Sequence, residues 1–348
     1  MAQQTLKPAS GKKSAGDMDA TDRQFLNITQ SRFPLADEPY KVIAGELGIS
    51  EAELFIRLAA LRKANVVRQI SAIFDTRRLG YKTTLVAMAY HADRLHKSAL
   101  YINRHPGVSH NYAREGSFYN LWFTLAVPPN EVLEDTVKQM AEKTGAQAFR
   151  VMPTIRFFKI GVNFDMVSQK SAAFDYSPDG YNQPISKDWN KPVHLSDFDI
   201  RAIQELQEDL PMIPRPFDNM ARRLGLTNQQ LFDLAKEFQD RGIMRRYSAV
   251  LYHRKAGFRA NAMAVWKVPE DRAEAVGKIM ARHTGVTHCY QRPTFPDWPY
   301  THFTMIHAVS KEGCEDAVKE IERATDIHDY LILYSNREYK KTRVRYFV

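Results

Sequence analysis

The chain has 348 residues, of which 44% are hydrophobic and 26% charged, and its formal net charge is +9. Only two cysteines occur and no run of eighteen apolar residues exists, which excludes a disulfide framework, a four-cysteine metal site and a membrane span. We therefore expect a cytoplasmic protein of two or more domains that makes no membrane contact, with a basic surplus that favours polyanionic partners.

The first sixty-six residues predict a tail followed by three short helices. Residues 1–19 are rich in Lys, Ser, Gly and Ala, which is typical of a disordered tail. Over 20–66, "TDRQFLNITQ" begins with a Thr N-cap, "KVIAGELG" ends in a C-cap glycine, and "SEAELFIRLAALRKAN" opens with the capping box of Ser50 and Glu53. The tight "LGIS" turn between the last two helices predicts a helix-turn-helix domain.

Strand and helix signals alternate over 67–165. Strands are predicted near 67–75, 83–91, 107–114, 119–127 and 149–158, and helices near 93–104 and 131–144. Without the first strand, the order is βαββαβ, which is typical of a ferredoxin-like plait. Residues 166–195 are polar and broken by Pro and Gly, so we interpret them as a linker.

The second half of the chain repeats the first. "VVRQISAIFDTRRLGYK" at 66–82 matches "IMRRYSAVLYHRKAGFR" at 243–259 without a gap, and "FTL" at 123–125 matches "FTM" at 303–305. The repeat predicts a second helix-turn-helix domain over 196–243 and a second plait over 244–348. The expected fold class is therefore α+β: two tandem repeats, each a winged helix-turn-helix followed by a ferredoxin-like domain. This architecture resembles that of the Lrp/AsnC transcription regulators.

That resemblance makes DNA binding the first functional hypothesis. Helix 51–64 carries three basic and two acidic residues, but its counterpart 227–241 carries two basic and three acidic residues. The second helix would repel phosphate, and two dissimilar helices in one chain do not match a palindromic operator. We therefore favour a structural role for the helical parts over DNA binding.

A short polar pattern occurs once in each half, as "GVSHNYAR" at 107–114 and "GVTHCYQR" at 285–292. His110, Tyr112 and Arg114 form the first triplet, and the second triplet is the corresponding set His288, Tyr290 and Arg292. Alternate residues of a strand share a face, so each triplet is expected on one face of its sheet, and Cys289 on the opposite face from its neighbouring histidine.

A solvated polar face would explain one such triplet, but two in register beside Arg-rich strands favour a pocket for a polycarboxylate. Guanidinium groups bind carboxylates in a bidentate manner, and His and Tyr transfer protons. The histidines and tyrosines of both triplets are the catalytic candidates. The candidates for ligand binding are Arg68, Arg77, Arg114, Arg245, Arg246, His253, Arg254, Arg292 and His302.

Segments of both plaits resemble the sirohaem decarboxylases. "ISAIFDTRRLGYKTTLVAM", "GVSHNYAR", "YNLWFTL" and "FFKIGVNFDM" are similar to one subunit type of that family. "MRRYSAVLYHRKAGFRANAMAVW", "VTHCYQRP", "WPYTHFTMIH" and "YSNREYKKTRVRYF" are similar to the other. Joined in one chain, they resemble the fused NirDL type from about residue 20 onward.

The resemblance implies removal of the acetate carboxyls at C12 and C18 of sirohaem as CO2, a step towards haem d1 in denitrification. It implies sirohaem as ligand, no cofactor beyond the iron and macrocycle of this substrate, no separate metal site, and NirG and NirH subunits as candidate partners. His or Tyr would donate the proton and Arg would clamp carboxylates. The residues favour the second half as the better equipped site, since it has Cys289 in place of Asn111 and His302 in place of Trp122, and the first half would be either active or only supportive. His253 and His302 are candidates for ligating the substrate iron.

Three questions stay open at this point. The fusion implies an internal pseudo-dimer, but further association of two chains into a homo-oligomer is undecided. The alternative function is an Lrp/AsnC-like regulator that senses a tetrapyrrole. The "PTFPDWP" insertion after the second triplet would either cover a planar macrocycle or form a rigid hairpin.

Overall fold

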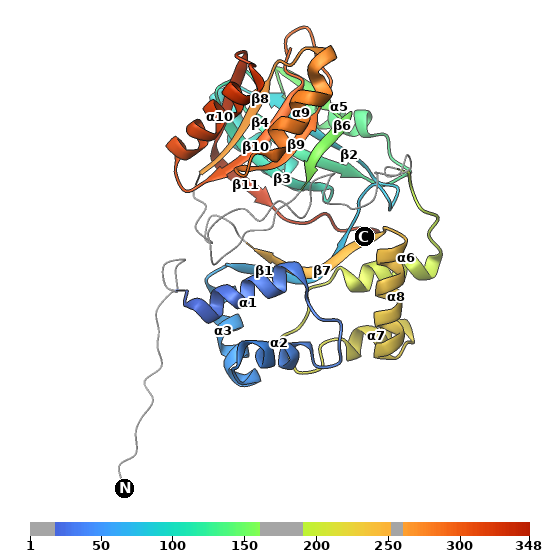
Figure 1. Cartoon of the computed structure of the whole chain (residues 1–348). Helices are drawn as coiled ribbons and strands as arrows, with labels where there is room; N and C mark the ends of the chain where they lie inside the picture. Colours follow the sequence, from blue (N-terminus) through green and yellow to red (C-terminus); the bar gives the residue numbers. More distant parts are fainter. Residues whose placement is uncertain (1–17, 161–190, 252–259) are drawn as a thin grey trace.

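The computed structural model describes residues 18–160, 191–251 and 260–348. Residues 1–17 of the predicted tail, most of the predicted linker, and His253 and Arg254 lie outside the described residues. Figure 1 shows two layers, with the helical parts of both halves below and the two plaits above. A ribbon of two strands lies between the layers. No helix of the described part of the chain is long and apolar enough to cross a membrane.

Each half contributes three of the described helices to the lower layer. They are α1 (Ala20–Ser31), α2 (Pro39–Leu47) and α3 (Glu51–Lys63) in the first half, and α6 (Asp197–Leu206), α7 (Asp218–Leu224) and α8 (Asn228–Asp240) in the second. Ser50 caps α3 by accepting from the Glu53 amide, but the Glu53 carboxylate accepts from Arg57, so only the Ser50 half of the predicted capping box is found. The predicted Thr cap of α1 is wrong, because the Asp19 carboxylate accepts from the Asp22 amide and starts the helix earlier.

The two helical trios bury one shared core instead of two separate ones. Phe25 and Leu58 of the first trio and Leu206 and Phe238 of the second belong to the same buried cluster. Burial of their apolar side chains stabilises the layer as a single unit.

The first strand of each half pairs with its counterpart in the other half. β1 (Val67–Phe74) and β7 (Met244–Leu251) are antiparallel, and Ser71 lies opposite Ser248, its equivalent in the repeat. The two halves are therefore related by an approximate two-fold axis through this ribbon.

The remaining strands and four helices build the two plaits of the upper layer. The first plait holds β2 (Lys82–Ala89), α4 (Ala92–Ile102), β3 (Val108–Glu115), β4 (Leu121–Val127), α5 (Leu133–Thr144) and β5 (Ala148–Met152). The second holds β8 (Ala260–Trp266), α9 (Ala273–Arg282), β9 (Val286–Gln291), β10 (His302–Ala308), α10 (Lys311–Thr325) and β11 (Tyr330–Lys341). The strand orders β5-β2-β4-β3 and β11-β8-β10-β9 are those of ferredoxin-like plaits and confirm the predicted fold class.

The last strand of each plait continues into the other plait. β11 pairs with β8 over Tyr330–Tyr334 and then with β3 over Tyr334–Lys341. In the first half, the equivalent strand is broken into β5, which pairs with β2, and β6 (Arg156–Ile160), which pairs with β9. β5 and β6 are the two ends of the combined sheet. Only three residues separate them, so the sheet curls back on itself.

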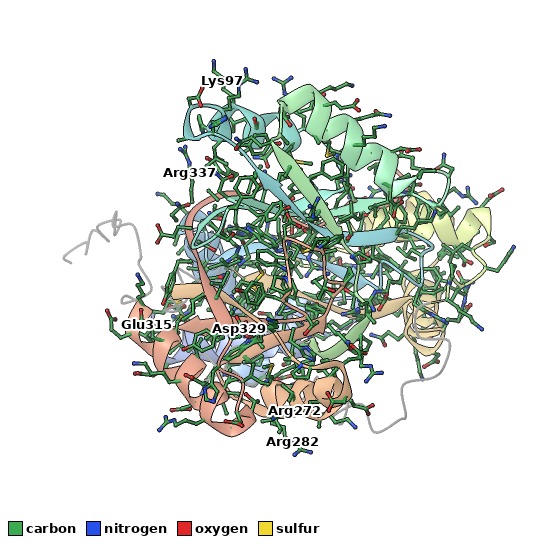
Figure 2. All side chains as sticks on the ribbon, turned by 90° about the horizontal axis from the view of Figure 1, so that it is seen from above. Lys97, Arg272, Arg282, Glu315, Asp329 and Arg337 are labelled. Carbon is green, nitrogen blue, oxygen red and sulfur yellow. The ribbon has the colours of Figure 1, made fainter. Side chains whose placement is uncertain are left out.

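Helices cover the outer faces of the curled sheet. α4 and α5 lie on one side and α9 and α10 on the other, with charged side chains such as Lys97 and Arg282 pointing outward (Figure 2). The inner faces pack against each other through Trp122, Met263, Trp298 and Phe303. Trp298 belongs to the "PTFPDWP" insertion, and its backbone pairing with Phe295 makes the insertion a hairpin that packs on this core.

The C-terminal residues beyond β11 return to the lower layer. The Tyr346 amide donates to Gln207 Oε1 (2.8 Å), and Gln207 Nε2 donates to the Tyr346 carbonyl (3.0 Å). Phe347 N donates to the Tyr81 hydroxyl (2.7 Å). This segment thus connects the plaits to helix α6.

Candidate active site

Both triplets line one cavity of about 460 Å³ between the inner faces of the two sheets. Two more titratable residues, Lys341 and His307, also line the cavity. None of the described residues that line the cavity is acidic. The cavity is thus electropositive and suited to an anionic ligand.

The glycine that begins each polar octet has a packing function in the first half. A Cβ on Gly107 would lie 1.8 Å from the Ala126 carbonyl oxygen, so only glycine lets β3 approach β4 at this point. The close approach sets where the first triplet enters the cavity wall.

A β-bulge precedes each triplet histidine and redirects the residue before it. The strand registers shift at Ser109 in β3 and at Thr287 in β9. The Ser109 hydroxyl consequently lies 3.0 Å from His110 Nδ1, and the Thr287 hydroxyl lies 3.1 Å from His288 Nδ1. Bulges next to functional sites commonly re-aim a side chain in this way. Each imidazole is therefore held at Nδ1, which leaves Nε2 as its second polar atom.

The triplet arginines are nearly buried, with exposed fractions of 4% for Arg114 and 8% for Arg292. Arg114 Nη1 donates to the Leu333 carbonyl (3.1 Å), and Arg292 Nη1 donates to the Met152 carbonyl. These two carbonyls occupy equivalent positions, where β11 and β5 leave their own plaits. Each arginine also lies over the tyrosine of its triplet, at 5.3 Å and 4.9 Å from the ring centroid. Their charges are therefore fixed in the cavity wall.

Both triplet histidines titrate far below neutral pH. Burial lowers the pKa of His110 to about 3, with further lowering by Lys341 and His288. Burial lowers the pKa of His288 to about 4, and the charges of Lys341 and Arg245 add to the effect. Both imidazoles are therefore neutral at pH 7 in the ligand-free protein.

Of the other predicted arginine clamps, none of the described ones lines the cavity. Arg68 donates to the Lys341 carbonyl and lies 3.5 Å from Glu338, and Arg245 pairs with Asp75 at 2.6 Å. Arg77 lies over the Phe157 ring at 5.7 Å, and Arg246 contacts Ser248 Oγ at 3.3 Å.

Arg68, Arg77, Arg245 and Arg246 therefore do not line this cavity, and their role as carboxylate clamps stays a prediction. Arg68, Arg245 and Arg246 lie on the β1–β7 ribbon. Arg77 lies on the turn that follows β1, next to Thr76, which does line the cavity. Their charges still act on the site, because Arg68 lowers the pKa of His110 and Arg245 that of His288.

His302 is not a cavity residue either. Its Nε2 lies 2.9 Å from the Ala273 carbonyl oxygen, and its ring stacks on Phe158 beneath α9. The match of "FTL" with "FTM" in the sequence aligns His302 with Trp122. Strand pairing instead aligns Trp122 with Phe303, since they lie opposite Tyr112 and Tyr290. A register error of one residue exchanges the two faces of a strand, which moves His302 to the helix-covered side.

Two residues of the site were missed from the sequence. His307 and Lys341 line the cavity but belong to neither triplet. Alternation along the strand places Phe303, Met305 and His307 on one face, which would have pointed to His307. The one-residue error in aligning the two halves concealed this signal. Cys289 lies as expected on the opposite face from His288, with its thiol 3.8 Å from the Gly277 carbonyl oxygen.

Family models match most of the chain. The "AsnC-like ligand binding domain" matches residues 78–159 and 255–340, and the "Siroheme decarboxylase NirDL-like HTH domain" matches residues 22–68 and 199–245. Each model thus matches once in each half, in agreement with the repeat.

Relatives named as siroheme decarboxylases match nearly the whole chain or one half of it. A siroheme decarboxylase from Hydrogenobacter thermophilus is 39% identical, covering 93% of this chain and 94% of the relative. A siroheme decarboxylase beta subunit from Methanosarcina barkeri is 45% identical over 97% of its length and 42% of this chain. The crystal structure of the siroheme decarboxylase NirDL with an iron-uroporphyrin III analogue has a TM-score of 0.69 and 35% identity, covering 94% of this chain and 95% of that chain.

Proposed function

This chain belongs to the sirohaem decarboxylases of the fused NirDL type, and we propose that the cavity lined by both triplets removes both the C12 and the C18 acetate carboxyls to give 12,18-didecarboxysirohaem. One observation carries the proposal: two equivalent His-Tyr-Arg triplets line one cavity. In the macrocycle, the acetates at C12 and C18 are related by an approximate two-fold axis in the plane of the ring. The approximate two-fold axis of the protein would give each acetate its own triplet.

The charge of the cavity suits this substrate. Sirohaem carries eight carboxylates, and the cavity wall carries Arg114, Arg292 and Lys341 without an acidic side chain among its described members. Burying a charge is costly unless it meets an opposite charge. The substrate carboxylates would supply that charge, and the fixed arginines would determine which arms approach the histidines.

The chemistry needs one proton for each CO2 released. When the bond between the methylene and the carboxylate carbon breaks, its electron pair moves towards the macrocycle, which delocalises it. The methylene carbon then takes a proton and becomes a methyl group. We assign His110 and His288 as the proton donors, one for each arm, with Tyr112 and Tyr290 beside them. Substrate carboxylates near these imidazoles would raise their pKa values, so binding and proton uptake would be coupled.

Other predictions belong to the same proposal. The reaction would use no cofactor beyond the iron and macrocycle of sirohaem, and it would take place in the cytoplasm. The beta subunit match supports an internal pseudo-dimer, because one half of this chain corresponds to a whole separate subunit. Association with NirG and NirH subunits and formation of a larger homo-oligomer stay predictions.

Anaerobic incubation of the purified chain with sirohaem, followed by mass spectrometry, tests the function. We expect a product that has lost two carboxyls. The His288→Ala variant should slow decarboxylation by roughly a hundredfold or more while weakening sirohaem binding far less, since a general acid contributes mainly to the chemical step. Intact sirohaem after long incubation, together with tight binding to promoter DNA, would instead support the regulator alternative.

A further inference from the structure

The Thr287 hydroxyl connects two histidines of the cavity. Its Oγ1 lies 3.1 Å from His288 Nδ1 and 3.1 Å from His307 Nδ1, and it can also donate to the Met305 carbonyl at 3.2 Å. Thr287 itself is fully buried. A hydroxyl both donates and accepts, so it can pass a proton between the two rings.

The other nitrogen of His307 is supported by Asn261. His307 Nε2 lies 3.3 Å from Asn261 Nδ2, and Asn261 Oδ1 is buried and has no hydrogen-bond partner among the described residues. A half-turn of this amide would place the oxygen against Nε2, where it could accept from a protonated ring. The site can therefore hold His307 either neutral or as a cation.

The first triplet has no second histidine in the corresponding place. The Ser109 hydroxyl also contacts its histidine, but its next partner is the Thr124 hydroxyl at 2.7 Å. Strand pairing places Ala126 opposite Thr83 and His307 opposite Asn261. Ala126 thus occupies the position of His307, and the two ends of the cavity differ in their supply of protons.

An imidazole that the substrate carboxylates protonate must regain its proton after each transfer, and one that stays neutral cannot easily serve as an acid by itself. If His288 gave its only N–H proton to the substrate carbon, an imidazolate would remain in a buried site. No imidazolate forms when His288 Nδ1 receives a proton as Nε2 releases one. At the second triplet, the Thr287 hydroxyl lies where it can donate a proton to His288 Nδ1. The His307 ring can then return a proton to this hydroxyl.

We propose that His307 acts through Thr287 as the proton source for His288, which makes His307 a positioning and relay residue of the second triplet. This inference rests on the proposed decarboxylation. The His288 Nε2 proton goes to the substrate methylene as CO2 leaves, the Thr287 proton moves to His288 Nδ1, and the His307 Nδ1 proton moves to Thr287. A protonated His307 ring becomes neutral and is recharged from solvent, so that one proton is consumed for each CO2.

Single-turnover reactions with enzyme in excess over sirohaem test the relay. The Thr287→Val and His307→Gln variants should slow one of the two decarboxylations by about tenfold or more and leave the other near its wild-type rate. The product that has lost one carboxyl should accumulate, as the same isomer for both variants. Sirohaem affinity, followed by the absorption of the bound macrocycle, should change less than threefold. Thr287→Ser retains a hydroxyl and should restore the slowed decarboxylation.

Three outcomes separate the hypotheses. Equal slowing of both steps, or a loss of affinity alone, would overturn the relay and indicate a structural role for His307. Unchanged rates in Thr287→Val would overturn it as well, even if His307→Gln does not fold. Wild-type protein that leaves sirohaem intact would instead overturn the proposed function.

Discussion

At the scale of single residues, burial controls the chemistry of the site. His110 and His288 have pKa values of about 3 and 4 in the folded protein, against about 6.5 in an unfolded chain. The folded state therefore binds fewer protons between these values. Its stabilisation by the neutral imidazoles is fully present above pH 6.5 and is lost as the pH falls towards 4.

The first prediction concerns this pH dependence. The free energy of unfolding of ligand-free wild-type protein should decrease from pH 7 to pH 4.5, and the decrease should be smaller in His110→Gln and His288→Gln. Urea unfolding at several pH values measures it. His328→Gln is a control, because exposed His328 has its pKa raised by Glu322 and Asp326. If the free energy of unfolding falls with pH as steeply in both cavity variants as in the wild type, the pH dependence does not come from His110 and His288.

The second prediction follows from the same pKa values. Sirohaem carboxylates beside neutral histidines should raise their pKa, so binding should take up protons from solution at pH 6–7. Calorimetric titrations in buffers of different ionisation enthalpy measure that uptake. Binding without proton uptake, or with proton release, would show that the histidines do not face the carboxylates.

The third prediction concerns His302. Its hydrogen bond to the Ala273 carbonyl and its stacking on Phe158 are structural contacts. His302→Ala should therefore lower the free energy of unfolding by about 2–4 kcal/mol. The absorption spectrum of bound sirohaem should stay unchanged, and a shift of its iron-dependent bands would restore His302 as a ligand.

At the scale of elements, the order of strands and helices could be predicted from the sequence, but three features of the site could not. Periodicity does not indicate which residue of β4 corresponds to which residue of β10 in the repeat. An alignment error of one position misplaced His302 and hid His307. Bulges at Ser109 and Thr287 depend on pairing between distant strands. The crossing of β11 into the first plait likewise has no local signal.

The fourth prediction uses the close approach of β3 to β4. Gly107→Ala should destabilise the protein by several kcal/mol, because the added Cβ would overlap the Ala126 carbonyl. Gly45→Ala is the matched control, since its Cβ would meet no atom within 4 Å in the interior of α2. There alanine should stabilise by about 0.5–1 kcal/mol. Thermal unfolding measures both, and a harmless Gly107→Ala would refute this packing.

At the scale of the whole molecule, neither half can build the site alone. Each half lends its last strand to the plait of the other, the helical trios share one core, and each triplet supplies one side of the cavity. One chain therefore carries both halves, whereas the beta subunit from Methanosarcina barkeri corresponds to only one of them. The approximate two-fold symmetry of the protein would then match the two reacting acetate arms of sirohaem, while His307 distinguishes the two ends of the cavity.

The isomers formed by the two histidine variants test the one-triplet-per-acetate assignment most directly. His110→Gln and His288→Gln should each be incubated with sirohaem at limiting substrate, and the methyl groups of the products located by NMR. We predict that each variant stops after one decarboxylation, and that the two variants leave opposite acetates, C12 in one and C18 in the other. The same remaining acetate in both variants, or full conversion by either at the wild-type rate, would contradict the assignment of one triplet to each arm.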